Sequence, residues 1–421
     1  RQYLQMKSQY PDTILFYQVG DFYETFDEDA RVAARELQIV LTARHYGDEH
    51  VALAGVPLHA LENYVGKLIA RGYRVAICDQ VGDVPSKGVV DRAVTRILTA
   101  GTLSEPNLLP TRQNNYLVAL AQGVPAGTVT HSSAGRREKT RSDGLSAQKK
   151  LQSNVSTPDI EKKHAQTGLA VVDVSTGEFS VTWFSPDELP AALEAELQRL
   201  APVECLVQEG QHAPTFQLPA ETMTVTPCPT YFFEQEAAQT RLCGLFSTRS
   251  LEAYGCAQSP QAIAAAGAIV AYLEKMNPRL LSLLTGLHSY RPTSYMVLDA
   301  HTQRNLDLLQ SARNHTLQGS LLGVLDRTIT PMGARQLRRT LTRPLLDLAA
   351  LNDRLTSVEE LYESPALRSR FTMCLQRLGD LERIAGRVRQ GTAVPREVLG
   401  LREYLRVVPQ LADLLRGCDT S

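Results

Sequence analysis

The sequence has no long hydrophobic run and no closely spaced cysteines. Its longest uninterrupted apolar stretch covers residues 262–273, whereas a membrane-spanning helix needs about 20 such residues. The seven cysteines are odd in number, widely scattered and free of any CxxC pair. This usage argues against a disulfide framework or a cysteine-rich zinc site and favours a reducing compartment. We therefore expect a protein without a membrane segment, located in the cytoplasm.

The common catalytic motifs are also missing. The sequence contains no GxxxxGK[ST] phosphate-binding loop, no HExxH metal motif, no GxSxG and no GxGxxG. Its nine histidines are dispersed and do not have the spacing of metal ligands. We therefore expect no catalytic residue, no metal site and no bound cofactor within these 421 residues.

Length and charge describe a chain of several parts. At about 100–200 residues per domain, 421 residues predict two to four domains. The net charge of −1 would by itself argue against nucleic-acid binding. The charges are unevenly spread, however, because residues 167–285 carry 5 basic and 13 acidic side chains and residues 286–421 carry 19 and 14. An acidic segment followed by a basic one indicates parts with different partners.

Residues 1–122 have the pattern of a mixed α/β domain. Residues 13–19 are rich in β-branched and aromatic side chains, which predicts a strand. An acidic segment at 27–29 suits the start of a helix, and the apolar spacing across 61–70 predicts a second helix. A small sheet covered by these helices would bury their apolar faces.

The rest of the chain divides into three segments. Residues 123–166 contain no Phe, Tyr or Trp and carry a net charge of +4, which predicts a basic, disordered linker or insertion. Residues 167–288 alternate between strand and helix patterns and predict a second α/β domain. Residues 289–421 are dominated by helical spacing, most regularly at 348–362, and predict an all-α region.

The segment 20–26, GDFYETF, combines a tight turn with aromatic side chains and a carboxylate. In one interpretation the aromatics belong to the core and Glu24 is a surface acid, because aromatics near strand ends are usually buried. In the other, an exposed Phe22 inserts between base steps of a duplex, and the unstacking costs least at a mispaired or damaged step. A carboxylate beside it would repel phosphates but could accept a hydrogen bond from a base edge. The residue pattern alone leaves both interpretations open.

Short motifs of this kind continue in order along nearly the whole chain apart from residues 123–166. They are GDFYE at 20–24, AGVPLHA at 54–60, ENY at 62–64, VAICDQ at 75–80, SKG at 86–88, RxVxRI at 92–97, TAGT at 99–102, GLA at 168–170 with Asp173, STGEF at 175–179, LDA at 298–300, RNL at 304–306, LDRT at 325–328, TPMG at 330–333, Arg335, LRR at 337–339 and PL at 344–345. Together they resemble the MutS family of DNA mismatch repair proteins. The number and order of the motifs make the resemblance far more specific than any one of them.

The resemblance implies roles for the residues of segment 20–26. Phe22 matches the aromatic that wedges beside a mispaired base from the minor groove, and Glu24 matches the acid that hydrogen-bonds that base. Tyr23 lies between them and is expected to pack inside the domain.

Four basic residues are candidates for contact with the DNA backbone. The resemblance matches Arg44 and Arg92 to basic positions near the backbone. Independently, Arg92 and Arg96 have the spacing of side chains on one face of a strand, where they could follow a backbone or simply be solvated. Lys87, in a polar loop, is a weaker candidate.

The resemblance also implies an architecture and partners. We expect a mixed α/β mismatch-recognition domain, an α/β ribonuclease-H-like connector domain and an all-α core and lever domain that is incomplete at residue 421. A full-length family member would carry a C-terminal ATPase using ATP and Mg²⁺, form a homodimer and pass its signal to a MutL-like partner. Its target would be double-stranded DNA with a mismatch or a small insertion/deletion loop. On this basis the chain itself is not an enzyme, and we expect it in the bacterial cytosol with the nucleoid.

Two other functions remain as alternatives. The strand predicted at residues 169–174 carries Asp173. In ribonuclease-H-like folds a carboxylate on the first strand binds a metal, so a metal-dependent nuclease centred on Asp173 is one alternative. Such chemistry needs several converging carboxylates, and Asp173 is more simply a structural residue. The other alternative is an interaction scaffold that does not bind DNA, against which Phe22 and Glu24 argue.

Three arginines in the all-α region are candidates for signalling between domains. Arg335, Arg338 and Arg339 have the spacing of one helix face. They could form ion pairs with acids of the connector, since arginine suits buried bidentate pairing, or they could be a solvated face.

Overall fold

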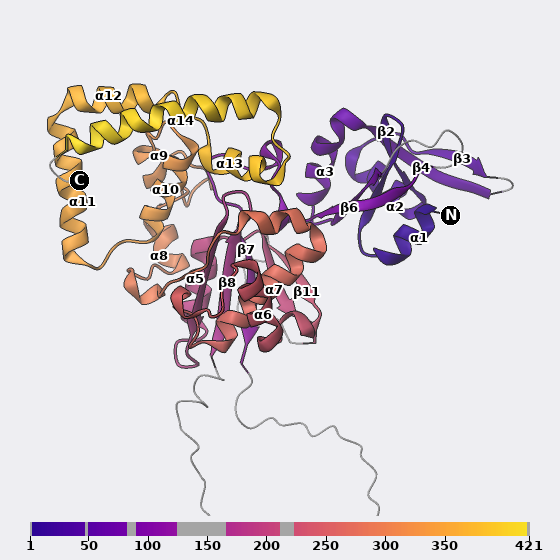
Figure 1. Cartoon of the computed structure of the whole chain (residues 1–421), viewed down its shortest axis with the longest axis horizontal. Helices are drawn as coiled ribbons and strands as arrows, with labels where there is room; N and C mark the ends of the chain where they lie inside the picture. Colours follow the sequence, from indigo (N-terminus) through magenta and orange to yellow (C-terminus); the bar gives the residue numbers. More distant parts are fainter. Residues whose placement is uncertain (1, 47–48, 82–89, 124–165, 211–222, 419–421) are drawn as a thin grey trace, which may run out of the picture.

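The computed structural model describes residues 2–46, 49–81, 90–123, 166–210 and 223–418. They form three units (Figure 1). The first unit, in indigo and violet, is at the upper right, and the helical unit, in orange and yellow, is at the upper left. The second unit, in magenta, is below and between them. The segment predicted as a linker falls almost entirely at 124–165, and it lies with Lys87 outside the described residues.

The first unit is built on a sheet that has six strands among the described residues, in the order β3-β4-β2-β1-β5-β6. The strands are β1 (Ile14–Val19), β2 (Phe22–Phe26), β3 (Thr42–Tyr46), β4 (Glu49–Pro57), β5 (Val75–Gln80) and β6 (Arg92–Leu98). Only β1 and β5 pair in parallel; the other neighbours are antiparallel. The strand predicted at 13–19 is confirmed as β1, an inner strand of the sheet.

The two faces of this sheet are covered differently. Helices α2 (Asp27–Leu37) and α3 (Leu61–Ile69) cover one face and confirm the two predicted helices. Helix α1 (Gln2–Gln9) covers only one end of the other face, where the Tyr3 ring lies 4.7 Å from the Phe26 ring. The opposite end of that face, around the start of β2, is open to solvent.

A two-residue turn joins β1 to β2 and fixes the position of Phe22. Val19 and Phe22 are paired across the turn. Gly20 has a φ of +59°, in the left-handed region that glycine adopts without steric cost. The dipeptide GD between two strand patterns therefore marks the turn that places Phe22 at the end of the hairpin.

The second unit contains another sheet of six strands among the described residues, in the order β11-β10-β7-β8-β9-β12. The strands are β7 (Leu117–Gln122), β8 (Thr167–Asp173), β9 (Glu178–Phe184), β10 (Glu204–Gln208), β11 (Thr224–Cys228) and β12 (His288–Ser289). Strands β7, β8 and β9 are antiparallel, and β10 and β11 run parallel to β7.

The position of β7 corrects the predicted boundary of the first domain. We expected that domain to cover residues 1–122, but residues 117–122 pair with β8 in the second sheet. Their almost continuous apolar sequence, LVALAQ, suits a strand that is buried on both faces. The first sheet therefore ends with β6, and the chain enters the second sheet at Leu117.

Helices cover both faces of the second sheet. Helix α5 (Ala191–Leu200) packs on one face, and α7 (Pro260–Met276) packs on the other beneath α6 (Gln235–Leu245). The sequence SPDE at residues 185–188 has the pattern of a capping box, but no helix begins there. Instead, the Glu188 side chain accepts a hydrogen bond from the Ser185 backbone amide within a turn, and the helix begins only after Pro190.

The third unit is helical, as predicted. Its helices are α8 (Ala300–Asn305), α9 (Leu321–Leu325), α10 (Pro331–Thr342), α11 (Leu348–Glu363), α12 (Pro365–Leu375), α13 (Leu381–Gln390) and α14 (Pro395–Arg416). Thr330 caps α10 by accepting a hydrogen bond from the Gly333 amide, and Pro331 occupies its first position. None of the described helices has both the length and the apolar character needed to cross a membrane.

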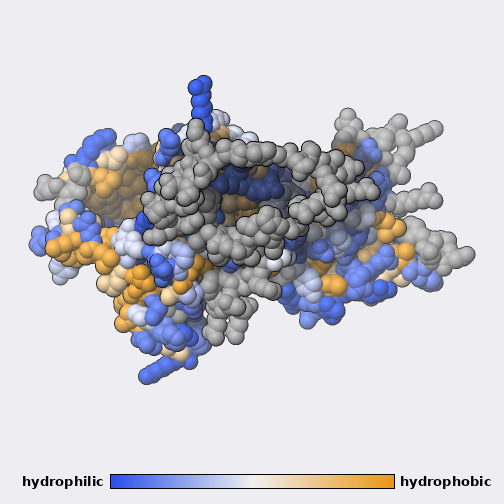
Figure 2. Space-filling view, turned by 90° about the horizontal axis from the view of Figure 1, so that it is seen from below, coloured by the Kyte–Doolittle hydropathy of each residue, from blue (hydrophilic) through white to orange (hydrophobic). Residues whose placement is uncertain are grey.

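The apolar face of α11 is not covered by the described residues. Leu348, Leu355, Val358 and Tyr362 have the spacing predicted for an amphipathic helix, yet all four are exposed. Hydrophobic surface gathers on the helical unit, at the left of Figure 2. The sequence pattern therefore predicted the helix correctly but not the exposure of its apolar face.

Candidate nucleic-acid interface

Four of the predicted DNA-contacting residues lie on one face of the first sheet. Directly paired residues on neighbouring strands point to the same face. Through such pairs, Phe22 and Glu24 on β2 share a face with Arg44 on β3 and Arg92 on β6. We call this set, Phe22, Glu24, Arg44 and Arg92, the reading face.

Phe22 and Tyr23 have opposite surroundings. The Phe22 side chain is 48% exposed, whereas Tyr23 is buried on the opposite face, where its hydroxyl donates a hydrogen bond of 2.5 Å to Asp79. The expectation that Tyr23 packs inside the domain is confirmed. The interpretation in which all aromatics of segment 20–26 are core residues fails for Phe22, because its ring faces solvent.

The neighbour of Phe22 and Glu24 on strand β4 is Gly55, which pairs directly with Glu24. A side chain at this position would begin 3.7 Å from Glu24 Cγ and 3.9 Å from Phe22 Cδ1. Glycine therefore leaves both side chains accessible from above the sheet.

Glu24 is a partly buried carboxylate with an unused oxygen. Its Oε2 has no hydrogen-bond partner among the described residues, and the nearest cation is Arg44 Nη1 at 3.8 Å. Burial raises the pKa of Glu24 above its ordinary value, and Arg44 only partly opposes this shift. Glu24 therefore keeps an unpaired, buried acceptor atom next to the exposed Phe22.

The prediction that Arg92 and Arg96 point to the same face of their strand is wrong. The register between β5 and β6 shifts at Ile77/Cys78, so that Thr95 is skipped and Arg96 points to the opposite face. Arg92 lies on the reading face, where its guanidinium group stacks over the Tyr17 ring at 4.9 Å and its Nε donates to the Gln18 carbonyl. Arg96 instead lies 4.0 Å from Glu105.

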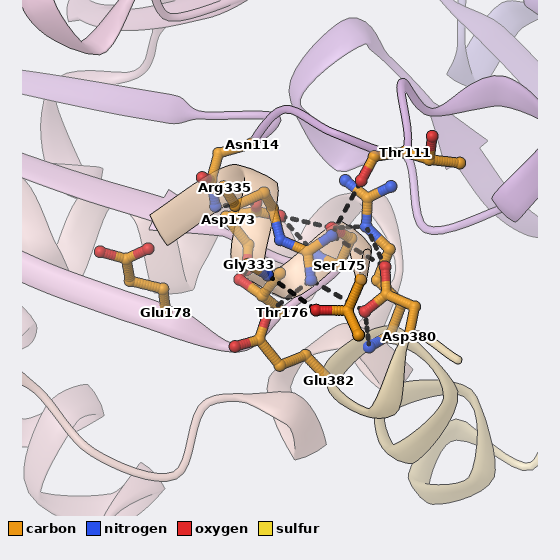
Figure 3. Close-up of polar contacts among 12 residues, drawn as sticks. Thr111, Asn114, Asp173, Ser175, Thr176, Glu178, Gly333, Arg335, Asp380 and Glu382 are labelled. Carbon is orange, nitrogen blue, oxygen red and sulfur yellow. Dashed lines mark hydrogen bonds and ion pairs between the residues drawn. The ribbon is translucent and has the colours of Figure 1, made fainter. Parts of the chain in front are cut away.

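Asp173 is a buried structural carboxylate rather than part of a metal cluster. Its Oδ1 accepts from the amide and the hydroxyl of Ser175, and its Oδ2 accepts from the Asn114 side chain and the Asn115 amide (Figure 3). It ends β8, the second strand of its sheet along the chain and not the first. Within the described residues, no group of three or more His, Cys, Asp or Glu is placed to hold a metal ion.

The predicted arginine cluster is only partly brought together. Arg335 is 4% exposed and forms a bidentate pair with Asp380 at 2.8 Å, and it also contacts Glu382 at 2.5 Å (Figure 3). Arg339 pairs with Glu178 of the second unit, so an ion pair joins these two units.

Arg338 departs from this arrangement. It makes no ion pair within the described residues, and burial lowers its pKa, with only Asp326 opposing the shift. Consecutive helical residues point about 100° apart, and among the described residues only Arg339 of these two forms an ion pair with the second unit.

Sequence reasoning missed Asp380, Glu382 and Arg383, which complete the junction between the helical unit and the second unit. Asp380 caps α13 by accepting from the Arg383 amide, and this capping position was the one local signal that the sequence offered. The burial of Arg383, 4% exposed, depends on partners more than 200 residues away along the chain.

Comparison with known proteins gives the same order of domains. Family models match in succession as MutS domain I at residues 1–107, MutS domain II at 135–285 and MutS domain III at 301–421. Relatives named DNA mismatch repair protein MutS include those of Dehalococcoides mccartyi, 41% identical over 432 residues, and Symbiobacterium thermophilum, 42% identical over 416 residues. These alignments cover 99% and 97% of the chain but 45% and 43% of the relatives, so the chain spans less than half of their length. The chain belongs to the MutS family of DNA mismatch repair proteins.

Proposed function

We propose that this chain senses mispaired or unpaired bases in duplex DNA and that its reading face does the sensing. The Phe22 ring would enter the minor groove between two base steps and stack on the mispaired base, kinking the duplex. Unstacking costs a few kcal/mol at such a step and least where pairing is already lost. Discrimination would then come largely from how easily the DNA deforms.

The observation that carries this proposal is the exposure of Phe22 beside an unused carboxylate oxygen. Phe22 is held at the end of a rigid hairpin rather than in a loose loop, so little ordering entropy would be lost on insertion. Glu24, whose pKa is raised by burial, would form a hydrogen bond to the unstacked base. The charge of Glu24 would also repel the phosphates of ordinary duplex and so penalise non-specific binding.

The basic residues of the first unit would position the DNA. Arg44 is half-exposed at the edge strand β3 and lies close to Glu24, so it could turn to a phosphate when DNA arrives. Arg92 is held more firmly by Tyr17 and Gln18 and would contact the backbone from a fixed position. Arg96 on the opposite face and Lys87 remain further candidates for backbone contact, without a direct role in reading the base.

We further propose that the second unit is a ribonuclease-H-like fold used as a connector and not as a nuclease. Support comes from three antiparallel strands, β9-β8-β7, followed by the parallel pair β10 and β11. The first of these strands along the chain, β7, carries no carboxylate, and both oxygens of Asp173 already accept hydrogen bonds from protein donors. In this proposal the ion pair of Arg339 with Glu178 carries the position of the connector into the helical unit, and the ion pairs of Arg335 with Asp380 and Glu382 brace α10 against α13.

For the whole protein we propose DNA mismatch repair in the bacterial cytosol, with the nucleoid, as a homodimer that recruits a MutL-like partner. Mismatches and small insertion/deletion loops would be its targets, and this part of the chain would sense them without catalysing a reaction. The resemblance implies ATP and Mg²⁺ for a full-length family member, but the residues present here do not fit them. The sequence has no GxxxxGK[ST] motif, and the described residues contain no cluster of metal ligands. No step of the proposal depends on them.

A comparison of DNA-binding affinities tests the proposal. Fluorescence anisotropy would compare the affinity of the chain for a duplex with one G·T pair and for the matched duplex, using the wild type, Phe22→Ala and Val225→Ala. Val225 is an equally solvent-facing apolar residue on a strand of the second unit and serves as the matched control. We expect the preference for the G·T duplex to disappear in Phe22→Ala alone. A preference that persists in Phe22→Ala would refute the wedge.

A further inference from the structure

We propose that residues 99–115 form a strap that mechanically links the first unit to the helical unit, and that Glu204 and Arg383 are the positioning residues at its two ends. The strap begins where β6, the last strand of the first sheet, ends. It ends where β7 enters the second sheet. Each step below rests on contacts between described residues and does not require DNA.

Glu204 holds the end of the strap next to the first unit. It lies on β10 and is 1% exposed. From the strap it accepts hydrogen bonds from Thr99 Oγ1 at 2.6 Å and from the Gly101 amide at 2.9 Å. From the second unit it accepts from the hydroxyls of Thr226 and Tyr272, both at 2.7 Å. Burying a carboxylate is costly unless hydrogen-bond donors replace its hydration. The four donors around Glu204 meet this need, and through them Glu204 fixes the strap to the second sheet.

The strap passes Glu204 too closely for an ordinary side chain. A Cβ at Gly101 would lie 3.0 Å from Glu204 Oε2 and 2.9 Å from the Leu117 side chain. Glycine therefore allows the backbone amide itself to reach the carboxylate, and any displacement of this part of the strap breaks that bond.

Arg383 holds the other end of the strap. It lies on α13 of the helical unit, and its guanidinium group is 4% exposed. Its two terminal nitrogens donate to the backbone carbonyls of Pro110 at 2.9 Å and Gln113 at 2.8 Å. Arg335 on α10 adds a bond of 3.0 Å to the carbonyl of Thr111 (Figure 3). Arginine is suited to this task because its planar group offers five donors in fixed directions.

A continuous set of hydrogen bonds joins the two ends. The Asn115 side chain donates to the carbonyl of Ala100 at 2.8 Å, and the Asn115 amide donates to Asp173 at 3.1 Å. Asp173 in turn accepts from the Ser175 hydroxyl at 2.7 Å, and that hydroxyl accepts from Arg383 Nε at 3.1 Å. The path therefore runs from the Glu204 end of the strap, through Asp173, to α13 without a gap.

The arrangement makes the strap respond as one body. A rotation of the first unit against the second sheet would displace the strap at Gly101 and would also loosen its bonds to Arg383. Spatial continuity alone does not establish energetic coupling, but it predicts where a local change at one end must be detected. It also assigns Asp173 a place in this path instead of a catalytic role.

Hydrogen–deuterium exchange on the intact chain tests the strap from its first end. The variants are Glu204→Gln and Thr99→Val, and Glu209→Gln is the matched control because Glu209 is exposed just after the same strand. We expect both test variants to speed exchange in peptides covering 99–103 and also in those covering 109–116 and 172–177, by about tenfold, the factor that loss of one buried hydrogen bond carries. Peptides of β4, which pairs with β2 and β3 on the other side of the first sheet, report global unfolding and should remain as in the wild type.

The same measurement is made from the second end with Arg383→Lys, which keeps the positive charge but loses the planar guanidinium group and its fixed donors. Arg389→Lys, on the exposed side of the same helix, is its control. We expect faster exchange at 109–116 and, through the strap, at 99–103, with no change in the control.

Faster exchange confined to the mutated end would overturn the inference, because the strap would then not transmit the change. If Glu204→Gln also loosens β4, the milder Thr99→Val variant decides by the same criterion. No DNA is present in this experiment, so its outcome is independent of whether Phe22 reads mismatches.

Discussion

Replacing Asp173 with asparagine separates a structural carboxylate from a catalytic one. Asparagine has nearly the same shape, but one of its two terminal atoms is a nitrogen that donates instead of accepting. Each oxygen of Asp173 accepts two hydrogen bonds, from Ser175 on one side and from Asn114 and Asn115 on the other. In either orientation of the new amide, two buried donors therefore lose their acceptor.

The expected loss of stability follows from this count. An unsatisfied buried donor costs about 1–3 kcal/mol, so Asp173→Asn should destabilise the second unit by about 2–6 kcal/mol. That is a large share of the roughly 5–15 kcal/mol by which a typical domain is stable. The single tryptophan, Trp183 on β9, lies in the same sheet, so its fluorescence during urea unfolding reports this unit directly. Asp187→Asn, at an exposed position of the same unit, should leave the transition unchanged.

The nuclease alternative makes the opposite prediction. If Asp173 held a metal ion, Asp173→Asn would abolish a Mg²⁺- or Mn²⁺-dependent cleavage of nucleic acid and would relieve, not create, an electrostatic cost in the metal-free protein. A variant as stable as the wild type that has lost such cleavage would refute the structural reading of Asp173.

Four further substitutions test the reading face and the helical unit. Burial raises the pKa of Glu24 in the folded chain, so the wild type loses stability as the pH rises through that pKa. Glu24→Gln should therefore have a higher thermal midpoint than the wild type at about pH 8 and the same midpoint at about pH 4. Equal midpoints at both pH values would contradict this. Arg335→Met should cost about 3–5 kcal/mol in urea unfolding because it removes the bidentate partner of the largely buried Asp380. Arg338→Met, which removes a charge without an ion pair, should be neutral or stabilising, and the reverse order would count against the assignment. Phe22→Ala should change the unfolding free energy of the unliganded chain by less than about 0.5 kcal/mol, since the ring is exposed, and a larger loss would place Phe22 in the core.

The elements of the fold were largely visible in the sequence because their signals are local. The apolar run of β1, the acidic start of α2 and the apolar spacing of α3 depend on residues close together in the sequence, and each element is present in the structure. The boundary at residue 122 was misplaced because β7 is identified by its partner β8, which follows only after the long basic segment. Strand pairing across such a distance leaves no periodic mark in either strand.

The residues of the candidate site were predicted less completely than the elements of the fold. The exposure of Phe22 follows from its place at a two-residue turn, and the family motifs pointed to it directly. The shared face of Arg92 and Arg96 was wrong because strand alternation assumes a regular ladder, and the skipped residue Thr95 reverses it. The roles of Glu204 and Arg383 were invisible because a buried charge is recognised by its partners, which lie in other units of the fold.

Local fluorescence beside a mismatch tests the central claim most directly. A 2-aminopurine base placed next to a G·T pair brightens when it loses stacking, so binding of the wild-type chain should increase its emission, and binding to the matched duplex should not. Phe22→Ala, assayed at concentrations that saturate the DNA, should bind without this increase. An equal increase with Phe22→Ala would contradict the claim that the Phe22 ring unstacks the mispaired base.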